Sequence, residues 1–222
     1  EEGRSVPRET CYRCRRPKEY CLCPKEPPME TRTRIVLLMH PMEWKREKCA
    51  TGRLTCLNLA NSEIIPGLAF GEIPRYRELV EDPANYPVLL YPGPRALNLS
   101  EGGFPSGSLG GRRLVVFLID STWACARSVL RASPCLLELP QVKFLPREPS
   151  RFVIKRQPRE YCLSTLEAAH ELLLALEAAG LDSYPDKARL LAAFDAMQRL
   201  QIEKARVSGR PRYLGMGPSG EA

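Results

Sequence analysis

Four cysteines lie close together near the start of the sequence, with the spacing C-x2-C-x6-C-x-C: Cys11, Cys14, Cys21 and Cys23. Four thiolates in one short stretch can complete the tetrahedral shell of Zn²⁺. Metal binding would also supply folding free energy to a segment with almost no aliphatic residues. We predict a structural zinc module over residues 1–30, because four sulfur ligands leave no open position for catalysis. A reduced, unstructured leader and an iron–sulfur site are the alternatives.

A carboxylate follows a continuous apolar run in the stretch LVVFLIDSTW, residues 114–123. Asp120 at the mouth of a buried strand would either cap the next helix or act as an acid or base. Capping by Asp120 or Ser121 is the simpler interpretation. Trp123 has no capping role, and its indole can pack on a planar ring. The pair Asp120 and Trp123 therefore indicates a binding or catalytic site.

The stretch LSTLEA contains Ser164 and Glu167 in the S-x-x-E spacing of a capping box. This pattern predicts a helix start and needs no ligand to explain it. A helix N-terminus is also a natural site for a carboxylate or phosphate. Lys155 and Arg156 lie just upstream and add positive charge.

His40 and Glu43 follow the first apolar run of the sequence, and either can cap a helix or lie on a solvated surface. The chain has 2 histidines, which argues against a histidine-based metal centre. It contains neither G-x-x-x-x-G-K-[ST] nor G-x-S-x-G. Nucleotide triphosphate hydrolysis and serine-hydrolase chemistry therefore have no support.

These residues need a framework, and the apolar pattern predicts one. Short apolar runs typical of buried strands occupy residues 35–39, 88–91, 114–119 and, less clearly, 152–155. Helical patterns occupy residues 122–133, 164–180 and 186–207. Alternating strands and helices predict an α/β domain with a mostly parallel sheet. In such folds ligands bind beyond the carboxyl ends of the strands, where His40, Tyr91 and Asp120 are expected.

Composition limits the class of protein. The 222 residues are 44% hydrophobic, enough for one core and a small appendage. A net charge of +7 is compatible with a polyanionic partner or with a merely basic domain. No apolar run approaches the roughly 18 residues of a membrane span, and the N-terminal residues have no signal-peptide pattern. We expect a cytoplasmic protein without a membrane or protein partner and with a flexible tail over residues 208–222.

In their order along the chain, these motifs resemble the DTW-domain family, whose members are tRNA-uridine aminocarboxypropyltransferases. The resemblance spans about residues 10–200. It rests on the cysteine cluster with RRP (15–17), HPME (40–43), TGRL (51–54), LLYPG (89–93), DSTW (120–123), SPCLLELP (133–140) and LSTLEA (163–168). The sequence departs from the family pattern at Ala50, Ser121 and Phe152.

The resemblance implies a SPOUT-like fold over residues 31–207, in which a C-terminal knot surrounds S-adenosylmethionine. It also implies transfer of the 3-amino-3-carboxypropyl group of S-adenosylmethionine to N3 of a tRNA uridine, with release of methylthioadenosine. Asp120 would accept the proton of N3. Thr122 would hold either Asp120 or the cofactor, and Trp123 would stack on a base or on adenine.

The remaining implied contacts fall into two groups. The cofactor-binding residues would be Tyr91, Pro92, Gly93, Asp120, Leu163, Ser164 and Thr165, with the helix start at residue 164 receiving the cofactor carboxylate. The tRNA contacts would be His40, Glu43, Lys45, Arg46, Arg53, Arg127, Arg131, Lys155 and Arg156. Two rival functions remain: an S-adenosylmethionine-dependent RNA methyltransferase of similar fold, and a zinc-ribbon RNA-binding protein without catalysis.

Overall fold

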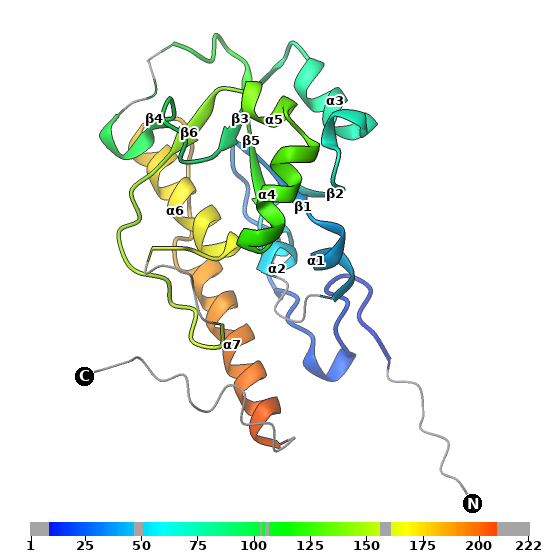
Figure 1. Ribbon diagram of the computed structural model, residues 1–222. Helices are drawn as coiled ribbons and strands as arrows, with labels where there is room; N and C mark the ends of the chain where they lie inside the picture. Colours follow the sequence, from blue (N-terminus) through cyan, green and yellow to red (C-terminus); the bar gives the residue numbers. More distant parts are fainter. Residues whose placement is uncertain (1–8, 47–50, 103, 105–106, 156–160, 208–222) are drawn as a thin grey trace, which may run out of the picture.

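The computed structural model describes residues 9–46, 51–102, 104, 107–155 and 161–207 (Figure 1). The predicted tail, residues 208–222, and Arg156 lie outside the described residues.

A sheet of six parallel strands forms the centre of the fold, in the order β2-β1-β5-β3-β6-β4. The strands are β1 (Arg34–Met39), β2 (Ser62–Pro66), β3 (Asn85–Leu90), β4 (Leu97–Asn98), β5 (Arg113–Asp120) and β6 (Gln141–Lys143). The central strands β1 and β5 are buried almost throughout, as their continuous apolar runs predicted. The mostly parallel α/β sheet is therefore confirmed.

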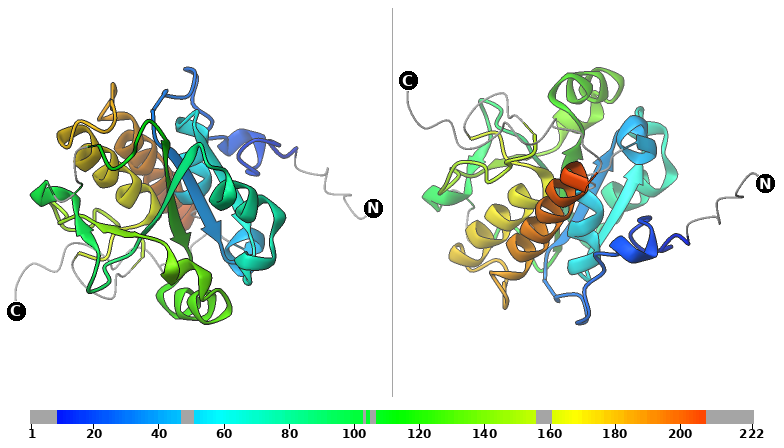
Figure 2. Two further views of the ribbon diagram at one scale, coloured as in Figure 1. Left: turned by 90° about the horizontal axis from the view of Figure 1, so that it is seen from above. Right: turned by 90° about the horizontal axis from the view of Figure 1, so that it is seen from below.

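Helices cover both faces of the sheet (Figure 2). The helices are α1 (Pro41–Arg46), α2 (Thr51–Asn58), α3 (Pro74–Glu81), α4 (Trp123–Ala132), α5 (Cys135–Glu138), α6 (Thr165–Ala178) and α7 (Arg189–Val207), with short 3₁₀ turns η1 (Lys18–Tyr20), η2 (Phe70–Glu72) and η3 (Leu99–Glu101). Leu54, Leu173 and Phe194 place α2, α6 and α7 in one apolar cluster. Leu79 and Val129 place α3 and α4 in a second cluster on the opposite face.

The predicted helices have the expected start and stop signals. Ser164 caps α6, and its side chain accepts a hydrogen bond from the Glu167 amide. Gly180, with φ of 71°, closes the C-terminal end, where its amide donates to Glu177 O. Glycine is favoured here because its backbone tolerates the left-handed conformation.

The strand predicted at residues 152–155 is wrong. The backbone there is held by a side chain of α7, since the Val153 amide donates to Gln198 Oε1 at 2.7 Å and Gln198 Nε2 donates to Arg151 O at 3.0 Å. The side chain of Gln198 thus forms the hydrogen bonds with the Val153 amide and the Arg151 carbonyl that a neighbouring strand would form in a sheet. Strands β2, β4 and β6 were not predicted, because β4 and β6 have only 2 and 3 residues and β2 (SEIIP) lacks a continuous apolar run.

The cysteine-rich segment joins the sheet domain through backbone contacts next to α2. The Met29 amide donates to Asn58 O, and the Ala60 amide donates to Met29 O. Among the helices that the structure describes, none has the length and apolar character needed to cross a membrane.

Candidate functional site

Asp120 ends β5, the strand between β1 and β3, at the carboxyl edge of the sheet. Its side chain is only 9% exposed. Thr165 Oγ1, on the first residue of α6, donates a hydrogen bond to Asp120 Oδ1 at 2.6 Å. The start of α6 and the end of β5 therefore meet at one carboxylate, although 45 residues separate the two side chains in sequence.

A third element, helix α2, also reaches this carboxylate. A Cβ atom at Gly52 would collide with Asp120 Oδ2 and lie within 3.1 Å of Leu37 Cδ1. Only glycine lets the first turn of α2 approach so closely. The first turn of α2, the positive end of its dipole, therefore lies close to the carboxylate of Asp120.

The helix that follows Asp120 is capped by a different residue. Thr122 is the N-cap of α4, and its Oγ1 accepts a hydrogen bond from the Cys125 amide at 3.3 Å. The interpretation in which Asp120 or Ser121 is the cap is therefore wrong. Trp123 is the first residue of α4, and its side chain lies outside the described atoms.

A cavity of about 350 Å³ lies beside this junction, between α4 and α6 at the carboxyl ends of β3, β5 and β6. We call it the apolar cavity; it is lined by Leu90, Tyr91, Pro92, Leu118, Ile119, Ser121, Ala126, Leu130, Lys143, Phe144, Pro146, Tyr161, Leu163, Thr165 and Ala168. Its volume falls within the range of about 300–1,000 Å³ that is typical of small-molecule sites.

The predicted cofactor residues divide into two groups. Tyr91, Pro92, Leu163 and Thr165 line the apolar cavity. Gly93 instead permits a close packing contact, because a Cβ atom there would collide with Gln141 Oε1. It lies in the loop that follows β3 and shapes the edge of the cavity through its neighbours.

Ser164, the remaining predicted cofactor residue, is occupied by the capping box. Its amide donates to Glu167 Oε2 at 2.8 Å. The same carboxylate receives the Arg151 amide at 2.6 Å and Ser150 Oγ at 2.9 Å. The N-terminus of α6 therefore already holds an anion, the carboxylate of Glu167.

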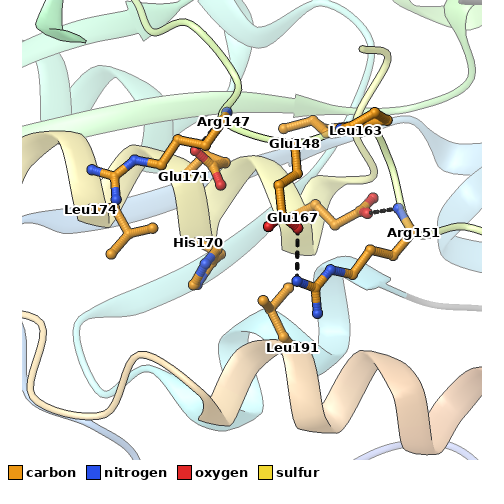
Figure 3. A pocket seen from close by; sticks show the side chains of 10 residues that line it. Arg147, Glu148, Arg151, Leu163, Glu167, His170, Glu171, Leu174 and Leu191 are labelled. Atoms are coloured by element: carbon orange, nitrogen blue, oxygen red, sulfur yellow. Dashed lines mark hydrogen bonds and ion pairs between the residues drawn. The ribbon is translucent and has the colours of Figure 1, made fainter. Parts of the chain in front are cut away.

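A second cavity, of about 210 Å³, lies on the other side of Leu163 (Figure 3). We call it the charged cavity; it is lined by Arg147, Glu148, Pro149, Arg151, Leu163, Glu167, His170, Glu171, Leu174 and Leu191. Arg151 Nη2 lies 2.8 Å from Glu148 Oε2. Burial lowers the pKa of His170 to about 4, and its Nδ1 lies 3.0 Å from the Tyr184 hydroxyl.

His40 performs the capping role that the sequence left open. Its Nδ1 accepts a hydrogen bond from the Met42 amide at 3.1 Å, and its carbonyl accepts the Glu43 and Trp44 amides at the start of α1. The His40 amide donates to Asp120 O at 3.2 Å. The cap of α1 is thus attached to the end of β5.

Trp44 links the cysteine-rich segment to α2 and was not singled out from the sequence. The guanidinium carbon of Arg15 lies 4.0 Å from the centre of the Trp44 ring, and that of Arg53 lies 4.4 Å from it. Arg53 Nη2 also donates to Trp44 O at 2.7 Å. Burial lowers the pKa of Arg53, Arg15 lowers it further, and Asp120 opposes this shift. Arg53 thus interacts electrostatically with both the site and the cysteine module.

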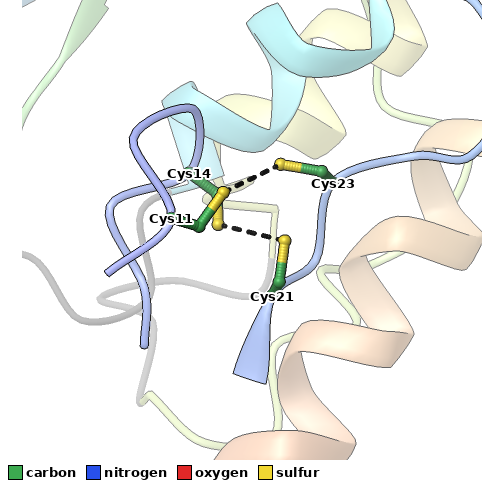
Figure 4. Close-up of side chains that lie close together, drawn as sticks. All are labelled: Cys11, Cys14, Cys21 and Cys23. Carbon is green, nitrogen blue, oxygen red and sulfur yellow. Dashed lines mark hydrogen bonds between the residues drawn. The ribbon is translucent and has the colours of Figure 1, made fainter. Parts of the chain in front are cut away.

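The cysteine cluster has the geometry of a metal site (Figure 4). The four Sγ atoms of Cys11, Cys14, Cys21 and Cys23 lie within 4.8 Å of one another. The Cys11–Cys23 and Cys14–Cys21 sulfur pairs are both 3.7 Å apart. Zinc–sulfur bonds of about 2.3 Å in a tetrahedron place the sulfurs about 3.8 Å apart. The cluster therefore fits a tetrahedral metal ion.

The local electrostatics of these thiols also suit a cation. The amides of Cys14 and Arg13 lower the pKa of Cys11 to about 6. Burial and the neighbouring thiol of Cys21 raise the pKa of Cys23. A bound dication would offset the mutual repulsion that opposes full ionisation of the cluster.

The family model described as DTW domain matches residues 8–202. The chain belongs to the DTW-domain family. Relatives of this DTW-domain chain include the tRNA-uridine aminocarboxypropyltransferase 2 proteins of Drosophila melanogaster, 34% identical, and Mus musculus, 33% identical. The tRNA-uridine aminocarboxypropyltransferase A of Arabidopsis thaliana is 28% identical.

The alignments differ in how much of each protein they cover. Those with the fly and mouse proteins cover 77% of this DTW-domain chain, and 67% and 57% of the respective relatives. The alignment with the Arabidopsis protein covers 93% of this chain and 86% of the relative. No solved structure matches the chain.

The residues of the DTW-domain chain that were predicted to contact RNA lie on several elements. Glu43, Lys45 and Arg46 belong to α1, which directly follows β1 at the edge where Asp120 lies; the side chain of Arg46 is outside the described atoms. Arg127 and Arg131 are exposed on α4. Lys155 is exposed and follows the segment held by α7. Their contact with RNA stays a prediction.

Proposed function

We propose that this DTW-domain protein transfers the 3-amino-3-carboxypropyl group of S-adenosylmethionine to N3 of a uridine in tRNA and releases methylthioadenosine. The observation that carries the proposal is the buried carboxylate of Asp120, held by Thr165 beside a cavity of about 350 Å³. The names of the fly, mouse and plant relatives support the same reaction.

The proposed chemistry balances as a nucleophilic displacement. Uridine N3–H is a weak acid, so a base that accepts its proton makes N3 a better nucleophile. N3 forms a bond to Cγ of the aminocarboxypropyl group, and the Cγ–S bond breaks. Its electron pair stays on sulfur, which changes from a sulfonium into the neutral thioether of methylthioadenosine. Asp120 is the proposed proton acceptor, and Thr165 fixes its orientation.

Positioning distinguishes this reaction from methyl transfer. Both the methyl carbon and Cγ are bonded to the same sulfonium, so the protein must choose which carbon faces N3. Holding the reacting atoms in a near-attack geometry can lower the barrier by about 7 kcal/mol or more. We propose that Tyr91, Pro92, Leu163 and Thr165 hold S-adenosylmethionine in the apolar cavity. Thr122 would support the loop that carries Asp120, and Trp123 would stack on a ring of one of the substrates.

The nucleic-acid substrate would contact the carboxyl edge of the sheet. We propose that the exposed side chains of Lys45, Arg127, Arg131 and Lys155 bind tRNA phosphates. Each neutralised phosphate releases counterions, so this binding should weaken with salt. Arg53 would act differently, since it packs on Trp44 and orders the surface between the cysteine module and α2.

We further propose that Cys11, Cys14, Cys21 and Cys23 hold a structural Zn²⁺. This ion would stabilise the segment that carries Arg15 against Trp44. Inductively coupled plasma mass spectrometry of the purified protein should find one zinc per chain, and Cys14→Ser should lose it. The SPOUT-like knot, the limits 1–30 and 31–207, and the tail 208–222 stay predictions.

The decisive experiment combines product analysis with a single substitution. Purified protein, tRNA and S-adenosylmethionine are incubated, and both the modified nucleoside and the sulfur product are identified by mass spectrometry. The wild type should form methylthioadenosine and an aminocarboxypropyl nucleoside. Asp120→Asn keeps the size of the side chain but removes the base, and should lower the rate about 100-fold or more. Glu148→Gln, at the exposed ion pair, is the matched control.

Each rival function has its own outcome in this assay. Accumulation of S-adenosylhomocysteine with a methylated nucleoside would overturn the proposal in favour of a methyltransferase. Absence of any sulfur product, with tight tRNA binding that Asp120→Asn leaves unchanged, would favour a zinc-ribbon protein without catalysis.

A further inference from the structure

The apolar cavity has an uneven distribution of charge. Among the described residues that line it, Lys143 is the one charged side chain. Tyr91, Ser121, Tyr161 and Thr165 supply the other polar atoms of side chains in the wall. A single ammonium group in a largely apolar wall is a natural partner for an anionic group of the ligand.

Lys143 is held in place by the sheet. It is the last residue of β6 and pairs with Asn98 of β4. Val142 is buried in the cluster that contains the α6 leucines. Because successive strand residues point to opposite faces, Lys143 points away from that cluster, toward the side of the sheet that α4 covers.

Lys143 is half-buried, and no salt bridge joins it to a carboxylate in the described part of the chain. The charged cavity provides the contrast, since its Arg151 already pairs with Glu148. Burying part of an ammonium group is costly unless an anion compensates it. A bound anion would supply that compensation at Lys143.

The other candidate anion site in this region is already filled. The sequence pointed to the N-terminus of α6 as the position for the carboxylate of S-adenosylmethionine. In the structure Glu167 occupies this position, where it accepts hydrogen bonds from the Ser164 and Arg151 amides. A second carboxylate there would face the first and be repelled by it.

We infer that Lys143 binds the α-carboxylate of the aminocarboxypropyl group of S-adenosylmethionine and so determines which part of the cosubstrate lies near Asp120. This inference rests on the proposed function and adds a specificity-determining residue to it. Two residues of the cavity lining then have separate functions: Lys143 binds the carboxylate, and Thr165 connects the wall to Asp120. Fixing the carboxylate also orients the carbon chain that links the carboxylate to the sulfur. Cγ, the carbon that is transferred, belongs to this chain.

Three probes separate the parts of the ligand in a binding experiment. S-adenosylmethionine has the complete group, decarboxylated S-adenosylmethionine lacks only the carboxylate, and methylthioadenosine lacks the whole aminocarboxypropyl group. Their dissociation constants are measured by calorimetry on the full chain. Lys143→Met removes the charge and keeps an unbranched apolar side chain, and Lys143→Arg keeps the charge. Lys187→Met is the matched control, since Lys187 is bound to Glu177 away from the apolar cavity.

Lys143→Met should weaken S-adenosylmethionine binding by about 10- to 100-fold, the loss of one charge-assisted hydrogen bond. Its affinity for decarboxylated S-adenosylmethionine and methylthioadenosine should stay within about 2-fold of the wild type, a change too small to represent a lost hydrogen bond. Retained methylthioadenosine binding also shows that the variant is folded. Lys143→Arg should restore most of the affinity for S-adenosylmethionine, and Lys187→Met should bind all three probes normally.

Two outcomes would overturn the inference alone: an unchanged affinity of Lys143→Met for S-adenosylmethionine, or an equal loss for all three probes. In both cases the wild type still binds S-adenosylmethionine and forms methylthioadenosine, so the proposed function stands. A wild-type protein that does not bind S-adenosylmethionine overturns the proposed function and the role of Lys143 together.

Discussion

The two cavities on either side of Leu163 share a wall and differ in how their charges are satisfied. In the charged cavity, Arg151 pairs with Glu148, and Glu167 accepts several hydrogen bonds from the chain. In the apolar cavity, Lys143 is the one charged residue of the described lining.

This difference favours the apolar cavity as the ligand site that we propose. Charges that pair with one another stabilise a loop and leave little for a ligand to gain. A lone charge in an apolar wall can instead give a bound ligand both affinity and orientation.

The largest effect is expected at Glu167, a residue of α6 that lines the charged cavity. Glu167→Ala would leave the Ser164 and Arg151 amides and the Ser150 hydroxyl without their acceptor. The Ser164 amide is buried and the other two donors are partly buried. An unsatisfied buried group costs about 1–3 kcal/mol and a partly buried one costs less, so the free energy of unfolding should fall by about 3 kcal/mol. Urea denaturation followed by circular dichroism measures this change. Glu171→Ala on the same helix is the control, and a loss below 1 kcal/mol for Glu167→Ala would contradict the prediction.

A larger side chain should weaken S-adenosylmethionine binding when it fills the apolar cavity, but not when it fills the charged cavity. Ala126→Leu places a larger side chain in the apolar cavity and should weaken S-adenosylmethionine binding by about 100-fold, or about 2.7 kcal/mol. Leu191→Phe fills part of the charged cavity and should leave that affinity unchanged. Isothermal titration of both variants tests the comparison directly. Equal losses in the two variants would show that the cavities are not functionally separate.

The charged cavity should also make stability depend on pH through His170. Burial, Arg151 and Arg147 lower its pKa to about 4, and Glu148 opposes this shift. Between the unfolded pKa of about 6.5 and the folded value, the unfolded chain binds a proton that the folded chain does not. The contribution of His170 to stability is therefore fully present above pH 6.5 and should be lost, by up to about 1.4 kcal/mol per pH unit, as the pH decreases toward 4. His170→Gln should reduce this part of the pH dependence, as measured by denaturation at a series of pH values. Identical pH profiles for the two proteins would refute the assignment.

The smallest effect is expected at the exposed ion pair on the rim of the charged cavity. Glu148→Gln breaks the ion pair with Arg151. The side chains of both residues are largely exposed to solvent. Exposed pairs contribute about 0–1 kcal/mol, so thermal unfolding should change little and S-adenosylmethionine binding not at all. A destabilisation above about 2 kcal/mol would mean that this pair organises the whole cavity.

The sequence predicted features that depend on residues close together in the chain. Continuous apolar runs indicated β1, β3 and β5, since a strand buried on both faces needs apolar side chains on both. The S-x-x-E spacing indicated the start of α6 because a capping box closes within four residues. The cysteine spacing likewise indicated a metal site, because all four ligands fall within one short segment.

The sequence failed where the partner lies far along the chain. The run at 152–155 has the composition of a strand, but Gln198 of α7 binds its backbone. Trp44 carries no motif, and its contacts with Arg15 and Arg53 appear only when the cysteine module packs beside α2. Lys143 ends a strand of three residues, too short for its apolar pattern to be recognised.

Asp120 shows where the division lies. By itself the sequence determined that a carboxylate ends a buried strand, because hydrophobic burial acts on each apolar residue wherever the chain goes. Only the tertiary structure decided that Thr165 binds Asp120 from 45 residues away. The parallel crossovers bring the carboxyl ends of the strands to one edge, and the pairing of side chains at that edge depends on register and packing, which local patterns do not encode.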